Sequence, residues 1–171
     1  KFDTGIRGKY LLSAHESKSH YLIGSSKALY SVNKKTLEKN VLIEDFIRDI
    51  KPHPFENGKL LVIGNGDVYL VDIINENFDV TPLYLNDKYS KDFQIFKFED
   101  INFVNENELF ISSSNGLFYM NQKDTIFLGI EDGMPSAHFT QIYIDKEKDL
   151  ILIGTYDNGF ISLKRKNSRT L

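Results

Sequence analysis

Four histidines are the residues best suited to metal binding or proton transfer, and they are spread along the chain. They are His15, His20, His53 and His138. No two of them stand at a metal-ligand spacing with a carboxylate partner, as in a His-Glu-x-x-His motif. The 171 residues include no cysteine, so the sequence offers no thiolate as a nucleophile or a metal ligand. We therefore predict neither a metal site nor a cofactor.

Acidic residues are the second group that could do chemistry, because cleavage of a glycosidic bond needs two carboxyl groups facing one cleft. The candidates are Asp45, Asp49, Glu99, Asp100, Glu131, Asp132 and Asp145. Aspartates at equivalent positions of a repeat typically cap turns, since their side chains accept hydrogen bonds from nearby backbone. The serines lack the Gly-x-Ser-x-Gly motif of a nucleophile elbow. We predict that this chain is not an enzyme, and a glycosidase or lyase is the less favoured alternative.

A third group of polar residues lies in turns that follow short apolar runs. Phenol, amide and carboxylate groups could bind sugar hydroxyls there, and an aromatic face could cover a sugar ring. Together with His138, the candidate ligand-binding residues are Asn115, Tyr156, Asp157 and Asn158. The competing interpretation of each is ordinary turn chemistry, because asparagine and aspartate favour turns by bonding their own backbone.

These turns belong to a repeat that occurs four times. Each copy has an apolar run, a small residue, a turn and a second apolar run. The first apolar runs end in Ile23-Gly24, Ile63-Gly64, Ile111-Ser112 and Ile153-Gly154. The aligned isoleucines are 40, 48 and 42 residues apart, and such a spacing with several short strands is typical of β-propeller blades. We expect the glycines to have a packing role, because a residue without a Cβ lets neighbouring backbone approach.

Strand-like runs also precede and follow each of these pairs. In the third copy Phe98–Val104 comes before the pair and Thr125–Ile130 comes after it. Turn dipeptides such as Asn57-Gly58 separate the runs, and Asn-Gly accepts the positive φ of tight hairpins. The sequence therefore predicts an all-β fold: a single β-propeller or propeller fragment over residues 1–171, with about four four-stranded antiparallel blades. The blades are placed at approximately residues 8–44, 45–86, 95–130 and 138–164, and only the fourth is expected to be incomplete.

One segment, Glu38–Lys51, also fits an amphipathic helix. Its Val41, Ile43 and Ile47 are β-branched, which favours strands. Pro52 would end any helix that began there. Because the same register fits the strands of the other copies, we predict strands in this segment.

Charge and hydropathy argue against two classes of partner. The chain has 21 Lys+Arg against 24 Asp+Glu, a net charge of -3 and a pI near 5.8, which is not the footprint of a nucleic-acid-binding protein. Basic residues cluster at the extreme C-terminus, where we expect a solvated tail: Lys164, Arg165, Lys166 and Arg169. No apolar run approaches the roughly 20 residues of a membrane-spanning helix, so we expect no membrane contact by this chain.

Residues 131–161 contain the most specific motif. They read Glu131-Asp132-Gly133-Met134-Pro135, then Ile142 and Asp145, then Ile151-Leu152-Ile153-Gly154-Thr155, then Asn158-Gly159-Phe160. This stretch resembles the two-component regulator propeller repeat, with its Asp-Gly-Leu-Pro turn, Ile-x-x-Asp strand, Leu-Trp-Ile-Gly-Thr strand and closing Gly-Leu. Leu152 replaces the usual Trp, and His138 stands where the family often has Asn. The resemblance covers about one blade, and the other three share only the Ile-Gly-like strand and the hairpin after it.

The resemblance implies a function. Such repeats form the periplasmic sensor region of hybrid two-component proteins, which continue into a membrane span and a histidine kinase. Many members sense oligosaccharides. On this basis the chain is expected to be a periplasmic, ligand-sensing propeller segment of such an inner-membrane regulator, with an oligosaccharide as its ligand. A propeller that serves as a protein-binding scaffold is the alternative.

The number of blades also predicts an assembly. Propellers usually close into rings, whereas an open fragment exposes the apolar faces of its first and last blades. The apolar residues there are Tyr10, Leu11, Leu12 and Tyr21 in the first blade, and Ile151, Ile153, Phe160 and Ile161 in the last. We therefore predict a homodimer or higher oligomer through these faces. The rival prediction is a closed four-blade ring in which residues 2–6 supply the strand missing from the fourth blade.

Overall fold

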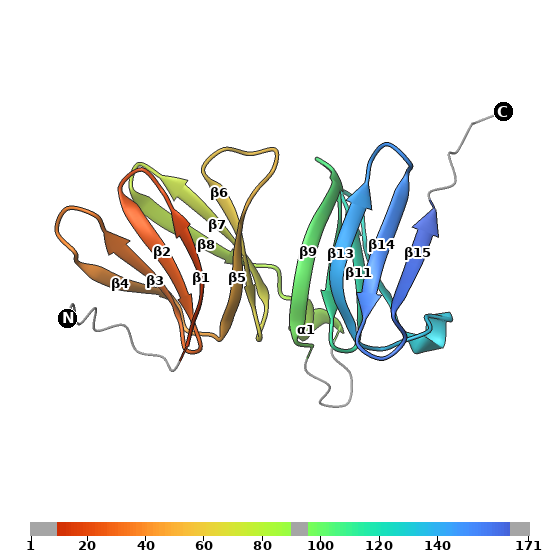
Figure 1. Cartoon of the computed structure of the whole chain (residues 1–171). Helices are drawn as coiled ribbons and strands as arrows, with labels where there is room; N and C mark the ends of the chain where they lie inside the picture. Colours follow the sequence, from red (N-terminus) through yellow and green to blue (C-terminus); the bar gives the residue numbers. More distant parts are fainter. Residues whose placement is uncertain (1–9, 90–95, 165–171) are drawn as a thin grey trace. The chain divides into compact units, whose positions relative to one another are not determined.

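The computed structural model describes residues 10–89 and 96–164. These residues form four antiparallel sheets in two compact units, Lys1–Phe98 (unit 1) and Glu99–Leu171 (unit 2). Figure 1 shows that the strands of each sheet follow one another in chain order as a meander. The predictions for residues 2–6 and for the basic cluster beyond Lys164 concern positions outside the described residues.

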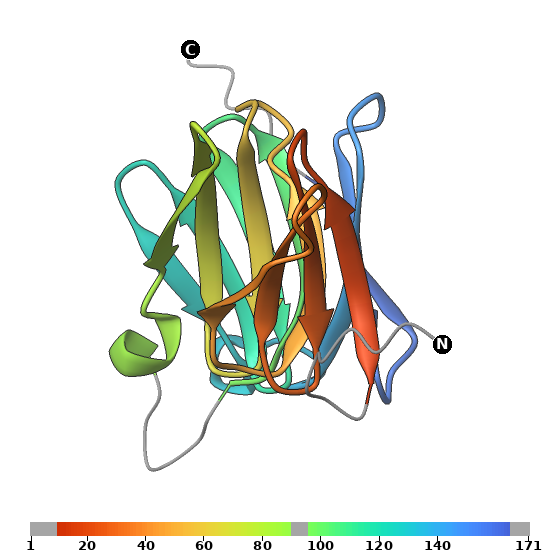
Figure 2. The ribbon, with the colours of Figure 1, turned by 90° about the vertical axis from the view of Figure 1, so that its left-hand side faces the viewer.

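Unit 1 contains the first two sheets, which we call blades 1 and 2. Blade 1 consists of β1 (Leu11–Glu16), β2 (His20–Ser25), β3 (Leu29–Asn33) and β4 (Lys39–Ile43). Blade 2 consists of β5 (Ile47–Pro52), β6 (Lys59–Gly64), β7 (Val68–Ile74) and β8 (Asn77–Pro82). A short helix, α1 (Leu85–Tyr89), follows β8 and is visible in Figure 2. The segment Glu38–Lys51 lies in β4 and β5, which confirms the strand prediction.

Unit 2 contains blades 3 and 4. Blade 3 consists of β9 (Phe98–Asn105), β10 (Glu108–Ser113), β11 (Gly116–Asn121) and β12 (Thr125–Leu128). A 3-10 turn, η1 (Ile130–Asp132), leads to blade 4, with β13 (Phe139–Asp145), β14 (Leu150–Thr155) and β15 (Phe160–Lys164). Blade 4 has three strands among the described residues. The all-β fold with about four antiparallel blades is thus confirmed.

Each unit has an apolar core between its two blades. In unit 1 the buried residues are Leu22, Leu29 and Ile43 from blade 1 and Ile47, Ile50, Leu60, Val62 and Val71 from blade 2. In unit 2 they are Val104, Phe110 and Leu117 from blade 3 and Phe139, Ile142, Ile151 and Ile153 from blade 4. Within each unit we call the face of the first blade that packs on the second blade its leading face, and the face of the second blade that packs on the first its trailing face. Both cores join a leading face to a trailing face.

Hydrogen bonds between the first strands of the two blades, β1 and β5 in unit 1 and β9 and β13 in unit 2, accompany these apolar contacts. In unit 1 the Ser13 hydroxyl accepts the Ile50 N–H at 3.1 Å and donates to Asp49 Oδ1 at 2.9 Å. In unit 2 the Asp100 carboxylate accepts the Ile142 N–H at 2.8 Å. In both units a side chain from the first strand of one blade therefore accepts a backbone N–H from the first strand of the second blade. Each of these contacts lies close to a β-bulge.

The second copy of the repeat is aligned differently in the structure than in the sequence. The first residue of the first strand pairs with Ser25 in blade 1, where it is Leu11, and with Gly64 in blade 2, where it is Ile47. Gly64 is therefore equivalent to Ser25, and its alignment with Gly24 was wrong by one residue. The run Leu60–Gly64 is buried on both faces, so side-chain alternation cannot define its register. The equivalent β-branched residues of the four blades are Ile23, Val62, Ile111 and Ile153.

Gly24 lies where blade 1 meets blade 2. A Cβ on Gly24 would lie 2.7 Å from Ile47 Cγ2, so only glycine lets β5 approach this closely without rearrangement. This confirms the expected packing role at Gly24. At Gly64 a Cβ would instead collide with the Asp45 carboxylate of its own blade.

Candidate functional site

Two loops of blade 4 form a single surface in unit 2. One is the segment 134–138, which precedes β13, and the other is the loop 156–159 between β14 and β15. Antiparallel pairing places Phe139 opposite Thr155, so the start of β13 lies beside the end of β14. The two loops are therefore adjacent because of the strand register, although they are far apart in the sequence.

Hydrogen bonds hold the two loops together. Asn158 Nδ2 donates to the Pro135 carbonyl at 2.9 Å, and Ser136 Oγ donates to Asp157 Oδ1 at 2.6 Å. The Asn158 N–H also donates to Thr155 Oγ1 at 2.9 Å. The side chains of Asp157 and Asn158 thus join the two loops, and Thr155 accepts the hydrogen bond within the turn. Together these bonds fix the loop that carries Tyr156.

Tyr156 and His138 form a stacked pair on this surface. Their ring centroids are 5.2 Å apart with an interplanar angle of 12°, and the Tyr156 N–H donates to the His138 carbonyl at 3.0 Å. Tyr156 remains 79% exposed, so the ring face turned away from His138 is open to solvent. His138 Nε2 lies 3.5 Å from Glu99 Oε1 at the start of β9, which connects the pair to blade 3.

The structure brings four of the five predicted residues together: His138, Tyr156, Asp157 and Asn158. Asn115 lies instead in the β10–β11 hairpin of blade 3, where it is half-buried and its N–H donates to Ser113 Oγ at 3.4 Å. Sequence reasoning missed Glu99 as a partner of His138, since the two residues belong to different blades and no local pattern relates them.

Three of the acidic candidates in unit 2 accept hydrogen bonds from backbone N–H groups. Asp100 accepts the N–H groups of Ile101 and Ile142. Asp132 accepts the Gly129 N–H, and Asp145 accepts two N–H groups of its own turn. These contacts are the capping contacts expected of aspartates in a repeat. The arrangement around Tyr156 therefore offers an aromatic surface and hydrogen-bonding groups for recognition.

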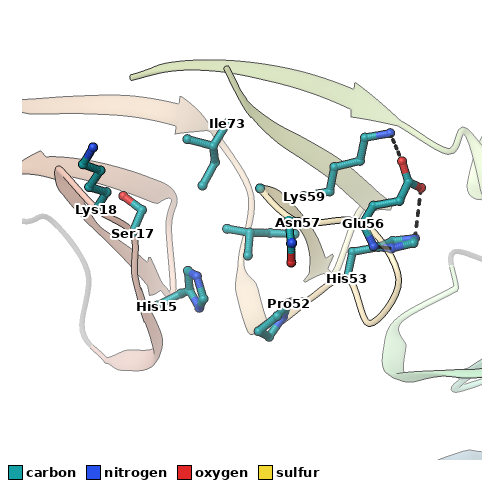
Figure 3. A pocket seen from close by; sticks show the side chains of 11 residues that line it. His15, Ser17, Lys18, Pro52, His53, Glu56, Asn57, Lys59 and Ile73 are labelled. Atoms are coloured by element: carbon teal, nitrogen blue, oxygen red, sulfur yellow. Dashed lines mark hydrogen bonds and ion pairs between the residues drawn. The ribbon is translucent and has the colours of Figure 1, made fainter. Parts of the chain in front are cut away.

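Unit 1 contains a separate pocket of about 310 Å³ between the β1–β2 hairpin and the β5–β6 loop. Figure 3 shows the Glu56 side chain directed at both Lys59 and His53. His53 Nδ1 accepts the Glu56 N–H at 3.0 Å, so this ring caps the loop that carries it. The lining residues are His15, Ser17, Lys18, Pro52, His53, Glu56, Asn57, Gly58, Lys59, Leu60 and Ile73.

The two histidines of the pocket are biased toward the neutral form. Burial lowers the pKa of the His53 imidazole, and the nearby Glu56 carboxylate partly opposes this shift. Burial also lowers the pKa of His15, with Glu16 acting in the opposite direction. Several polar groups on the β5–β6 side of the pocket already bond one another, which makes it a weaker candidate than the open ring of Tyr156.

Comparisons with known proteins address the fold. No protein-family model matches the sequence, and no curated protein sequence matches it. The extracellular domain of the putative hybrid two-component system BT4673 from B. thetaiotaomicron is similar in structure, with a TM-score of 0.65 and 18% identity over 93% of this chain and 21% of that chain. The β-propeller domain of Cps50 (Swd1) from Myceliophteria thermophila gives a TM-score of 0.62 and 13% identity over 94% and 53%. YCF48 bound to D1 peptide gives a TM-score of 0.58 and 16% identity over 90% and 50%.

These likenesses establish the β-propeller fold. The chain spans between about a fifth and about half of the length of these solved chains. Among residues 10–89 and 96–164, no helix is long and apolar enough to cross a membrane.

Proposed function

We propose that this chain is a ligand-sensing segment of the periplasmic propeller of a hybrid two-component regulator, and that its ligand is an oligosaccharide. The motif in residues 131–161 and the structural likeness to extracellular domains of hybrid two-component systems support the regulator. The exposed Tyr156 ring supports the ligand class. The chain itself has no catalytic role in this proposal.

The observation that carries the proposal is the exposed aromatic ring held on a fixed loop. A tyrosine with 79% of its surface exposed gains little from folding, yet its backbone and its ring are both held against His138. A pre-positioned aromatic ring can cover the apolar face of a sugar while its hydroxyl bonds a sugar hydroxyl. Because the ring is already oriented, binding costs little side-chain entropy.

The contact between His138 and Glu99 connects the proposed ligand-binding loops of blade 4 to blade 3. A sugar on Tyr156 would restrain the stacked pair, and Glu99 relates that pair to β9 of blade 3. A ligand can shift a conformational equilibrium only by binding one state more tightly. We infer that the state favoured by the ligand is the one in which His138 is held between Tyr156 and Glu99.

The test is a glycan array followed by titration calorimetry with the best ligand. We expect weak binding, with a Kd between micromolar and millimolar, because the chain spans only part of the propellers it resembles. Tyr156→Ala should weaken binding about tenfold, which corresponds to roughly 1.4 kcal/mol. Tyr84→Ala is the matched control, since Tyr84 is also an exposed tyrosine but lies in unit 1.

Three results would contradict the proposal. Tyr156→Ala could leave the affinity of the selected glycan unchanged. Lys18→Ala could weaken binding instead, which would move the site to the pocket of Figure 3. Hydrolysis of a glycoside that is abolished by substitution of one Asp or Glu would replace sensing with catalysis.

A protein-binding scaffold is the second candidate function. Exposed tyrosines are enriched at protein interfaces, and Tyr143 and Tyr156 are both more than half exposed. A pull-down with peptide libraries that depends on Tyr156, together with an empty glycan array, would favour the scaffold.

A further inference from the structure

The pocket of Figure 3 lies at one end of the core between blades 1 and 2. Ser13 of β1 bonds Asp49 and Ile50 of β5, so the hairpin that follows β1 lies beside the loop that follows β5. The space between them has a volume of about 310 Å³, which is enough for a small organic molecule. All residues that line the pocket belong to unit 1.

The floor of the pocket is apolar because it continues the core of unit 1. Leu60 is buried in that core, and Ile73 packs against the same cluster. Pro52 pairs with Leu60 across β5 and β6 and also lines the pocket. These side chains can contact the carbon part of a ligand, while polar groups around them bind its polar part.

The charges on the loop side of the pocket cancel one another. Glu56 Oε2 accepts a hydrogen bond from Lys59 Nζ at 2.5 Å. This bond lowers the pKa of the Glu56 carboxyl and raises the pKa of the Lys59 ammonium, so both groups stay charged. His53 Nδ1 accepts the Glu56 N–H, so the neutral ring carries its proton on Nε2, which lies 3.6 Å from Glu56 Oε1. The loop side therefore adds no net charge.

The hairpin side of the pocket keeps one positive charge. The β1–β2 hairpin, residues 11–25, contains a single acidic residue, Glu16. Its carboxylate pairs with Lys34 Nζ at 2.5 Å and does not line the pocket, whereas the exposed Lys18 does. Burial lowers the pKa of the His15 imidazole, so near pH 7 this ring is neutral and adds a hydrogen-bonding group without a second charge.

Three lining side chains have no hydrogen-bond partner within residues 10–89 and 96–164: His15, Lys18 and Asn57. Figure 3 shows that His15 and Lys18 come from the hairpin side and Asn57 from the loop side. His15 pairs with the core residue Leu22, so strand alternation directs its side chain to the face that blade 1 turns to blade 2. An imidazole, an ammonium and an amide can each donate a hydrogen bond to an anion.

We propose that this pocket binds the carboxylate group of a small molecule, with Lys18 as the charge partner and His15 and Asn57 as further donors. A carboxylate has two oxygens with about four acceptor positions, which is enough for three donors. Its single negative charge matches the one positive charge of the pocket, whereas a dianionic phosphate would leave a negative charge unbalanced. This inference does not depend on the proposed function, because Tyr156 belongs to unit 2.

Titration of the isotope-labelled chain with propionate, followed by NMR, tests the proposal. We expect saturable shifts of the Asn57 side-chain amide and the His15 ring, with a Kd in the millimolar range, because the probe has few atoms. Propionamide has nearly the same shape but no charge, and it should bind at least about tenfold more weakly, since it cannot accept a charge-assisted hydrogen bond.

Lys18→Met should weaken propionate binding about tenfold, because it removes the charge and keeps a side chain of similar length. Lys35→Met is the matched control, since Lys35 is also an exposed lysine of unit 1 but does not line the pocket. It changes the net charge by the same amount and should leave the affinity unchanged. Asn57→Ala should weaken binding by a smaller factor, because it removes a neutral donor.

Four results would overturn the proposal. Propionate could give no saturable shift in the millimolar range, or propionamide could bind as tightly as propionate. Lys35→Met could weaken binding as much as Lys18→Met does, which would reduce the effect to the net charge of the chain. Inorganic phosphate or methyl sulfate could bind more tightly than propionate at His15 and Asn57, which would replace the carboxylate with another anion.

Discussion

Replacing Asp100 with alanine is expected to lower the free energy of unfolding by about 3 kcal/mol, because it leaves buried donors without an acceptor. The Asp100 side chain is 7% exposed, and its two oxygens accept the N–H groups of Ile101 and Ile142, each at 2.8 Å. Both isoleucines are buried, so water cannot replace the lost acceptor without opening the contact between blades 3 and 4. Urea denaturation followed by circular dichroism measures the change.

The matched control is Asp145→Ala. Asp145 also accepts two backbone N–H groups, from Glu147 and Lys148, but these donors lie in an exposed turn. Water can solvate them after the substitution, so the loss should stay within about 1 kcal/mol. Equal effects of the two substitutions would show that the bond between blades adds nothing to an ordinary turn cap. Asp100→Asn keeps one acceptor oxygen and should lie between wild type and Asp100→Ala.

This experiment also bears on the acidic residues as candidates for catalysis. A carboxylate that acts mainly on substrate can be removed with little loss of stability. A carboxylate whose removal costs several kcal/mol is one on which the fold depends. The contacts of Asp100 place it in the second group, and the equivalent position of blade 1 carries Ser13, which makes the same kind of contact without a charge.

The strands could be predicted from sequence because their signal is local and repeated four times. An apolar run, a small residue, a turn and a second apolar run recur in each copy, and Asn-Gly turns occur in three of the four. Each copy therefore supports the interpretation of the others. The segment Glu38–Lys51 was assigned to strands in this way, because the register of the repeat outweighed the helical periodicity of the segment. Pro52 at the end of β5 agrees with the same assignment.

The register of β6 could not be predicted in the same way. Both of its faces are apolar and buried, so a shift by one residue leaves the pattern unchanged. The bonds at its ends decide the register, and one of them joins the Gly66 N–H to Asp45 Oδ2, between residues far apart in the sequence. Contacts of this kind have no local signature.

The candidate site was predictable where its residues are neighbours in the chain. Tyr156, Asp157 and Asn158 are consecutive, and one turn carries all three. The stacking of His138 on Tyr156 depends on the pairing of β13 with β14. Glu99 belongs to another blade, so only the packing of blade 4 on blade 3 could reveal its contact with His138.

Leu117→Ala is expected to destabilise the chain by about 3 kcal/mol, since a fully buried leucine loses its contacts and leaves a cavity. Leu117 lies in the core between blades 3 and 4, where the surrounding strands cannot close the space freely. Leu29→Ala removes the equivalent side chain from the core of unit 1 and should have a similar effect. Both changes in the free energy of unfolding are measured by urea denaturation followed by circular dichroism.

Phe160→Ala is the informative comparison, because Phe160 occupies the position of Leu117 in blade 4 but is largely exposed. In a monomer its removal should cost less than about 1 kcal/mol, although phenylalanine is the larger side chain, since an exposed ring has few contacts to lose. If Phe160→Ala instead costs a monomer as much as Leu117→Ala does, the ring of Phe160 is already covered within one chain.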